Sequence, residues 1–454
     1  MKGVIWTFIL VLLLLQHDDG TAPRVLLATE ALLVIVGSYF MLGRATPTRF
    51  WSPLALFLLV LSVFHLGLIG NILTGVDPSF PRQSDYVWYD GSLGQAALSL
   101  CLIAIATYTA AAFWAIAAIQ PREQKPVDNA ANQFLSAVFS TVGAFVLMAS
   151  VALWFFLTIG QLGIGGLVGS YQSFLAMTST TGINLTYPAI GVGLGLTLSS
   201  PARGLQRAAI AFFVVFAVLG FFLGLRGEVL FPVAVGASVL ATRRKMPKMG
   251  LVIVGILVLL TLINAGKQIR QAGLGESGLS LNDATPLGAL AELGSTLRVV
   301  ATVLEWHEVR DEPFQAGATY AVLILRQVET LTGSVPPPAG ADYRLFNVEI
   351  INRAGGIGGS VIAEAYHNFA LPGVLMVMAL LGVIFARFST ARLAPVSLAV
   401  FVVIAVPLFN HVRNSFVPVL PMVILGLALV FVVFLSTRAS TARARESAGT
   451  SLDG

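Results

Sequence analysis

Long apolar runs recur along almost the whole chain and constrain its fold more than any other feature. A helix needs about 20 apolar residues to cross the roughly 30 Å of a bilayer's hydrocarbon core. Of the 454 residues, 56% are hydrophobic and 11% are charged, whereas soluble domains carry about 25% charged residues. The pattern therefore predicts an all-α polytopic membrane protein with about 12 transmembrane helices. The candidate spans are 3–16, 25–42, 53–75, 93–119, 133–159, 185–200, 208–224, 228–242, 249–265, 360–386, 395–410 and 416–436.

Basic residues support this topology. With a cytoplasmic C-terminal tail, alternation across the spans places every basic cluster between spans, such as Arg243-Arg244-Lys245, on the cytoplasmic side, as the positive-inside rule requires. Both termini are then cytoplasmic, and the net charge of +5 needs no nucleic acid to explain it. The first run, Val4–Leu15, also resembles a signal peptide, but no small-residue cleavage site follows it cleanly, so a span is expected.

The predicted spans divide the chain into four parts. Residues 1–265 form an N-terminal bundle of about nine spans, 266–359 a large extracytoplasmic loop, 360–436 three further spans, and 437–454 a disordered cytoplasmic tail. The loop is expected to be partly helical and to lie on the outer membrane face or over the mouth of the bundle. One loop helix starts with Thr285 as N-cap and Pro286 at its first position. A second is expected over Ala318–Leu331, ended by Gly333 and the prolines that follow.

A polar stripe opens the tenth span. Ser360, Glu364, His367 and Asn368 are spaced so that they share one helical face. Ionisable groups at a bilayer boundary are costly and usually face a cavity or the bundle interior. Two interpretations follow: a polar contact between helices worth about 1–2 kcal/mol, or a general base, Glu364 or His367, that takes a proton from a sugar hydroxyl.

Several arginines are expected on the same outer side. Arg226 lies in a very short connection, where it could snorkel outward or pair with Glu228, or bind phosphate oxygens with two parallel hydrogen bonds. Arg298, Arg353 and Arg270 could join it in an electropositive funnel for a pyrophosphate, although Arg298 could equally be solvated and Arg270 a membrane anchor. No metal-ligand spacing occurs, so no metal or other cofactor is expected.

The sequence also resembles a known family. Ser360-x3-Glu-x-Tyr-x-Asn-Phe-x3-Gly373 is similar to the late segment of bacterial oligosaccharide repeat-unit polymerases, the O-antigen (Wzy-type) polymerase family. Gly224-Leu-Arg-Gly227, and Pro313–Tyr320 with the proline cluster that follows it, resemble two further segments of that family, so the likeness covers roughly 208–390. Ala370 replaces the usual glycine, and His367-Asn368 partly echoes the related O-antigen ligases.

The resemblance implies a metal-independent membrane glycosyltransferase of GT-C-like architecture in the bacterial cytoplasmic (inner) membrane, with an outward-facing site. Donor and acceptor would be undecaprenyl-pyrophosphate-linked oligosaccharides, and a chain-length-regulating membrane protein is a possible partner. The alternatives are an O-antigen ligase-type transferase, a lipid-linked oligosaccharide flippase or transporter, and an assembly partner without enzymatic activity.

The resemblance also implies roles for the candidate residues. Arg226 and Arg353, with Arg298, would stabilise the pyrophosphate leaving group. Glu364 or His367 would orient or deprotonate the acceptor hydroxyl, and Tyr366 and Asn368 would hold sugar. Arg270 and Tyr320 complete the expected substrate-binding set.

Overall fold

The computed structural model of the chain is built from helices, and no strand occurs among the residues that it describes. These residues are 1–19, 22–78, 80, 84–119, 129–163, 183, 186–201, 203–247, 251, 255, 258, 261, 285–390 and 393–450.

All predicted spans except the ninth coincide with described helices. The helices are α1 (Lys2–Asp19), α2 (Arg24–Ala45), α3 (Pro53–Leu66) with α4 (Ile69–Thr74), α6 (Ser92–Ala118), α7 (Asn129–Leu162), α9 (Thr186–Thr197), α10 (Gly204–Phe222), α11 (Arg226–Ala241), α17 (Val361–Ser389), α18 (Pro395–His411) and α19 (Val419–Thr450). Most of the ninth span, 249–265, lies outside the described residues. In the described part of the chain, seven helices have the length and apolar composition to cross a membrane. The protein is therefore a multi-pass membrane protein, and the total of about 12 spans stays a prediction.

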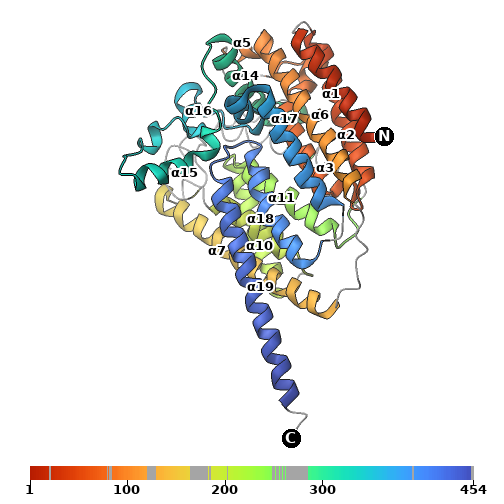
Figure 1. Cartoon of the computed structure of the whole chain (residues 1–454), viewed down its shortest axis with the longest axis vertical. Helices are drawn as coiled ribbons and strands as arrows, with labels where there is room; N and C mark the ends of the chain where they lie inside the picture. The colour runs from red at the N-terminus through yellow and green to blue at the C-terminus, as the bar shows by residue number, and fades with distance from the viewer. Residues whose placement is uncertain are drawn as a thin grey trace, which may run out of the picture.

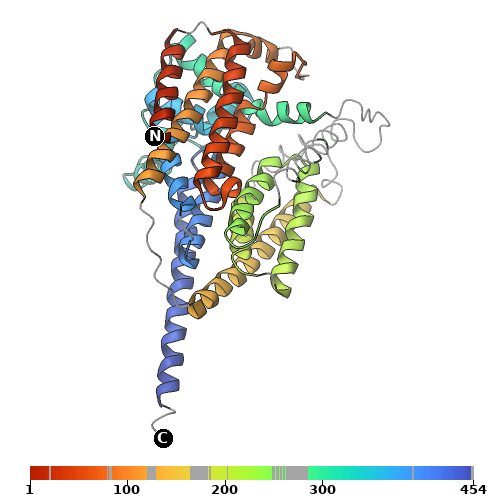
Figure 2. The same cartoon turned by 90° about the vertical axis from the view of Figure 1, so that its right-hand side faces the viewer.

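The helices surround two hydrophobic cores. In the larger core, α1, α2 and α17 pack against α6 (Figure 1). The smaller core joins α7, α9, α10 and the start of α11 around Trp154 and Phe216, and Figure 2 shows these four helices on one side of the molecule. α18 contacts α9, α11 and α19, so it connects the two cores.

The described part of the long loop folds back onto the bundle. Thr285 accepts a hydrogen bond from the Gly288 amide and caps α13 (Pro286–Leu293), as its sequence predicts. α14 (Leu297–Leu304) then packs against α6 and α17, because its apolar positions, including Val300 and Leu304, are buried. The stretch Pro286–Val309 is itself among the seven helices apolar enough to cross a membrane. The first half of the loop is thus part of the bundle rather than a separate unit.

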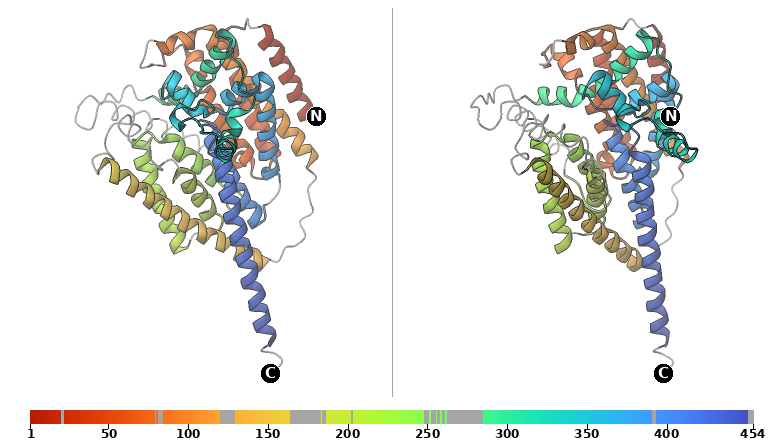
Figure 3. Two further views of the ribbon diagram at one scale, coloured as in Figure 1. Left: turned by 60° about the vertical axis from the view of Figure 1, so that its left-hand side comes forward. Right: turned by 90° about the vertical axis from the view of Figure 1, so that its left-hand side faces the viewer.

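The second loop helix, α15 (Ala318–Leu331), has the predicted bounds and is amphipathic. Thr319 and Val322 are buried, whereas Ile324, Val328 and Leu331 are exposed. Figure 1 shows α15 lying crosswise to α19. α19 itself extends beyond the rest of the molecule (Figure 3) and stays helical to Thr450, through most of the segment that was expected to be disordered.

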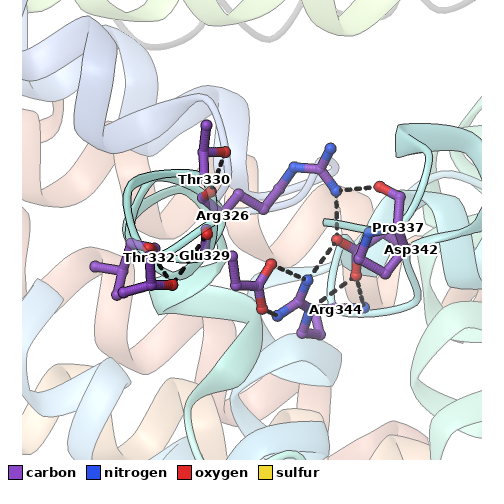
Figure 4. Close-up of polar contacts among 8 residues, drawn as sticks. Arg326, Glu329, Thr330, Thr332, Pro337, Asp342 and Arg344 are labelled. Carbon is purple, nitrogen blue, oxygen red and sulfur yellow. Dashed lines mark hydrogen bonds and ion pairs between the residues drawn. The ribbon is translucent and has the colours of Figure 1, made fainter. Parts of the chain in front are cut away.

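Two arginines fasten α15 to the chain that leads into the next helix, α16 (Phe346–Ala354). Arg344 binds Glu329 at 2.5 Å and Asp342 at 2.9 Å, and Arg326 binds Asp342 at 2.5 Å (Figure 4). Hydrogen bonds from Arg344 lower the pKa of the Glu329 and Asp342 carboxyls. The second half of the loop is therefore held by ion pairs at an otherwise exposed edge.

Replacing Arg344 with alanine should loosen this edge without unfolding the bundle. The loss of charge-assisted hydrogen bonds is expected to speed local opening about tenfold, measured as amide exchange or proteolysis within 318–345. Because the folded carboxyl pKa values are lowered, the wild-type stabilisation is complete above about pH 5 and is lost as the pH falls through the folded values. Arg344→Ala should weaken this acid transition, because Asp342 keeps only its pair with Arg326. Arg310→Ala, which breaks the exposed pair with Glu305, is the control, and equal opening rates in both variants would contradict the assignment.

Candidate functional site

A break in α17 organises the site. Phe369 and Ala370 have non-helical backbone angles, with φ 54° and ψ −151° at Ala370. Pro372 lies just beyond the break, where it has no N–H to donate to the carbonyl of Asn368, four residues earlier. That carbonyl instead accepts from the Ala316 amide, and the His367 carbonyl accepts from the Gln315 amide, both at 3.0 Å. The break therefore docks the segment before α15 onto the N-terminal half of α17.

The N-terminal half of α17 carries the polar stripe, and the structure buries it. Ser360 caps the helix by accepting from the Ala363 amide at 3.1 Å, and its hydroxyl lies 2.8 Å from the His65 ring. Glu364, His367 and Asn368 have at most 1% of their surface exposed. The side chains that the spacing placed on one face thus point into the protein, as ionisable groups in membrane helices usually do.

Glu364 connects three segments of the chain. Its Oε1 accepts from the Thr319 hydroxyl at 2.9 Å. Its Oε2 accepts from the Phe416 amide at 2.7 Å and lies 3.0 Å from His411 Nε2. The carboxylate thus holds α15, α17 and the turn between α18 and α19 together at one point.

Asn368 and Tyr320 each carry a buried polar atom near Glu364. Asn368 donates from Nδ2 to Thr319 and to the Glu364 carbonyl, at 2.6 and 2.7 Å. Its Oδ1 and the Tyr320 hydroxyl are buried without a hydrogen-bond partner in the described part of the protein. Burial, followed by the charge of Glu364, raises the pKa of Tyr320, so this hydroxyl remains a neutral donor. Unsatisfied buried polar atoms are rare, so these two stand out among the groups around Glu364.

His367 belongs to a second set of contacts, on the side of α14 and α16. Its Nδ1 lies 2.8 Å from His307 Nε2, and its Nε2 lies 2.9 Å from Glu349 Oε2. His307 Nδ1 in turn donates to the Glu312 carbonyl at 2.8 Å. His307 belongs to a single π-helical turn, Glu305–Val309, that follows α14.

Arg353 lies beside this set. It binds Glu349 at 2.6 Å and also forms an ion pair with Glu312, and its guanidinium stacks 3.9 Å from the Trp306 ring. Although burial opposes the effect, the two carboxylates raise the pKa of Arg353. The hydrogen bond from Arg353 lowers the pKa of Glu312. A permanently charged guanidinium thus lies next to the histidine pair, with about a fifth of its side chain exposed.

Tyr366 closes this side of the site. Its hydroxyl donates to Glu308, on the same π-helical turn as His307. The structure therefore brings together the predicted residues Glu364, His367, Tyr366, Asn368, Arg353 and Tyr320.

Comparison with known proteins shows the family of this chain. The family model described as O-antigen polysaccharide polymerase Wzy matches residues 4–442. The chain belongs to this family. It is also 24% identical over 369 residues to Protein CapE of Staphylococcus aureus, which covers 80% of each chain. No solved structure matches it significantly. The resemblance noted from the sequence over 208–390 is therefore confirmed, and extends over nearly the whole chain.

Ala370 is a position where this Wzy-family chain departs from the usual sequence, and its backbone is strained. Ala370 stands where the resemblance expects glycine, and its φ of 54° with ψ of −151° falls in a region that suits glycine. The family's usual residue therefore matches the backbone conformation that the break imposes.

The two other described arginines of the predicted funnel form ion pairs outside the polar stripe. Arg226, at the start of α11, pairs with Glu292 of α13 at 2.6 Å. Arg298 of α14 pairs with Asp85 of α5 (Ser84–Asp90) at 2.7 Å. Arg270 lies outside the described residues. Arg226 therefore pairs with a residue of the loop and not with Glu228, the partner that the sequence had left open.

Arg413 connects the start of α11 with the start of α17. Its carbonyl accepts from the Gly359 amide at 2.8 Å, directly before Ser360. Its guanidinium lies 5.6 Å from the Phe64 ring and is close enough to interact electrostatically with Glu228. The start of α11, which carries Arg226, therefore lies next to the turn between α18 and α19, whose Phe416 amide donates to Glu364.

Several of these residues were not predicted from the sequence. His307, Glu349, Glu312, His411 and Arg413 all contact predicted residues or their neighbours. His411 carried the clearest signal, because Asn410-His411 ends an apolar span, as His367-Asn368 lies near the start of another. Among the described residues, no group of three His, Cys, Asp or Glu could hold a metal ion.

Replacing Ala370 with glycine should stabilise the protein. Relief of an unfavourable backbone conformation, reduced by the greater chain entropy of glycine, is expected to raise the free energy of unfolding by about 1 kcal/mol. Thermal unfolding in detergent measures this. Ala365→Gly, in the regular part of the same helix, is the control and should destabilise by a similar amount; a loss of stability in both variants would show that Ala370 is not strained.

Proposed function

We propose that this protein polymerises lipid-linked oligosaccharide repeat units on the outer face of the bacterial cytoplasmic membrane. The donor is a glycan on undecaprenyl pyrophosphate, and the acceptor is the terminal sugar of another lipid-linked unit. The main support is a cluster of buried, hydrogen-bonded polar groups, Glu364, His367 and Asn368, beside Arg353 in a Wzy-family membrane protein. Both termini are cytoplasmic in this proposal.

The roles of the residues follow from charge and hydrogen bonding. Glu364 or His367 orients or deprotonates the acceptor hydroxyl, while Asn368, Tyr366 and Tyr320 bind sugar hydroxyls. The unpartnered Asn368 Oδ1 and Tyr320 hydroxyl support a sugar at this place, because they offer one acceptor and one donor.

Arginines stabilise the negative charge that develops on the departing pyrophosphate. Arg353 is the best placed of them, since it adjoins His367 through Glu349. Arg226 and Arg298 act from the neighbouring helices, and Arg270 is assigned to the same substrate. With cations in this role, the reaction needs no divalent metal. A chain-length-regulating membrane protein is the proposed partner.

The proposal can be tested by reconstituting the purified protein in bilayers with a polyprenyl-pyrophosphate-linked oligosaccharide and EDTA. A ladder of repeats on a gel is expected. Arg353→Ala and Glu364→Gln should each reduce its formation at least a hundredfold, with little change in melting temperature for Glu364→Gln, because the amide can bond the same neighbours. Arg310→Ala, an exposed arginine in the same region, should keep the ladder.

Other products would identify other activities. A single addition to a different acceptor would indicate a ligase, and movement of the lipid-linked sugar across the bilayer without a new linkage would indicate a flippase. A ladder that disappears in EDTA and returns with a divalent cation would reject metal independence.

A further inference from the structure

Three hydrogen bonds connect two imidazoles and a carboxylate in series beneath Arg353. They run from the Glu312 carbonyl to His307, from His307 to His367, and from His367 to Glu349, at 2.8, 2.8 and 2.9 Å. His307, His367 and Glu349 are all buried. We call these three side chains the His-His-Glu chain.

Counting protons in this chain gives a result that does not depend on the tautomers. Each of the three hydrogen bonds needs one proton between its two heavy atoms. A neutral imidazole supplies one N–H, and a carboxylate or a backbone carbonyl supplies none. Two neutral imidazoles and a carboxylate therefore supply two protons for three bonds, so the chain must hold one additional proton.

The additional proton changes the charge beside Arg353. With it, the His-His-Glu chain is neutral overall, and Glu312 alone balances the guanidinium. Without it, the chain has a charge of −1. Arg353 is then the single positive charge facing the two carboxylates that bind it. Two other titratable groups, Tyr366 of α17 and Glu308, face the chain and bind each other. Glu305 begins the π-helical turn that carries His307, and it pairs with Arg310 directly after that turn.

We propose that the His-His-Glu chain stores one proton that keeps Arg353 available to an external anion, and that loss of this proton weakens binding of the diphosphate donor. The functional half of this inference rests on the proposed polymerase activity, whereas the proton count does not. His307 and Glu349 are positioning residues here, since they act on the substrate through Arg353 and His367.

Glu349→Gln should remove the additional proton from the chain and keep all three hydrogen bonds. The glutamine oxygen can still accept from Arg353, and its NH2 group can donate to His367 Nε2. All three bonds are then satisfied by two neutral imidazoles, without the additional proton. Glu312→Gln is the matched control, because it removes one carboxylate charge from Arg353 but leaves the Glu312 carbonyl that accepts from His307.

The first measurement is the protonation state of the chain in bilayers at neutral pH. The protein has five histidines, so 15N-histidine and 13C-carboxyl-glutamate solid-state NMR gives few ring signals, assigned by single His→Gln variants. Wild type and Glu312→Gln should show one imidazolium or one protonated carboxyl in the chain, and Glu349→Gln two neutral imidazoles. Two neutral imidazoles with an ionised Glu349 in the wild type would overturn the proposal, whatever Glu349→Gln and Glu312→Gln show.

The second measurement is the pH dependence of polymerisation. Over the pH range in which NMR shows the proton leaving, the wild-type KM for the lipid-linked donor should rise about tenfold through the added negative charge, with a smaller change in kcat. Glu312→Gln should keep this dependence, and Glu349→Gln should lose it. A pH-independent wild-type KM would reject the functional half, and absence of any polymer would reject the proposed function while the NMR result still decides the proton count.

Discussion

The break in α17 is the constraint on which the site depends. A transmembrane helix has no water with which to replace a lost backbone hydrogen bond, and Pro372 removes one in the N-terminal half of this helix. The amides of Gln315 and Ala316 donate to the carbonyls of His367 and Asn368 beside the break. Their docking places Thr319 against Glu364, so the loop and the span form one structural unit.

Charge compensation is the second organising principle. Burying an unpaired ion costs several kcal/mol, and each described arginine of the predicted funnel has a carboxylate partner: Glu292 for Arg226, Asp85 for Arg298, and Glu312 with Glu349 for Arg353. These pairs join helices that are far apart in the sequence. They also fix where these cations lie, which hydrophobic packing alone would not specify.

Local features of the site could be predicted from the sequence, and tertiary pairings could not. The end of α15 follows from Gly333 and the prolines after it, and the buried stripe on α17 follows from helical spacing. The partner of Arg226 depends on how α13 returns to the bundle, and Glu228, two residues away, was the nearer choice. His307 and His411 reach the stripe from other helices, and neither position has a spacing relationship to Glu364 or His367. Pro372 was visible in the sequence, but the amides that compensate for it were not.

The environment of Arg353 has a consequence for any anion that binds there. Its guanidinium forms one hydrogen bond to each of two internal carboxylates, and a guanidinium has five N–H donors. An incoming phosphate can therefore bind beside these carboxylates, but it meets a cation whose charge they already partly neutralise. The electrostatic attraction that it gains is smaller than at an unpaired arginine, and its binding should depend less on ionic strength.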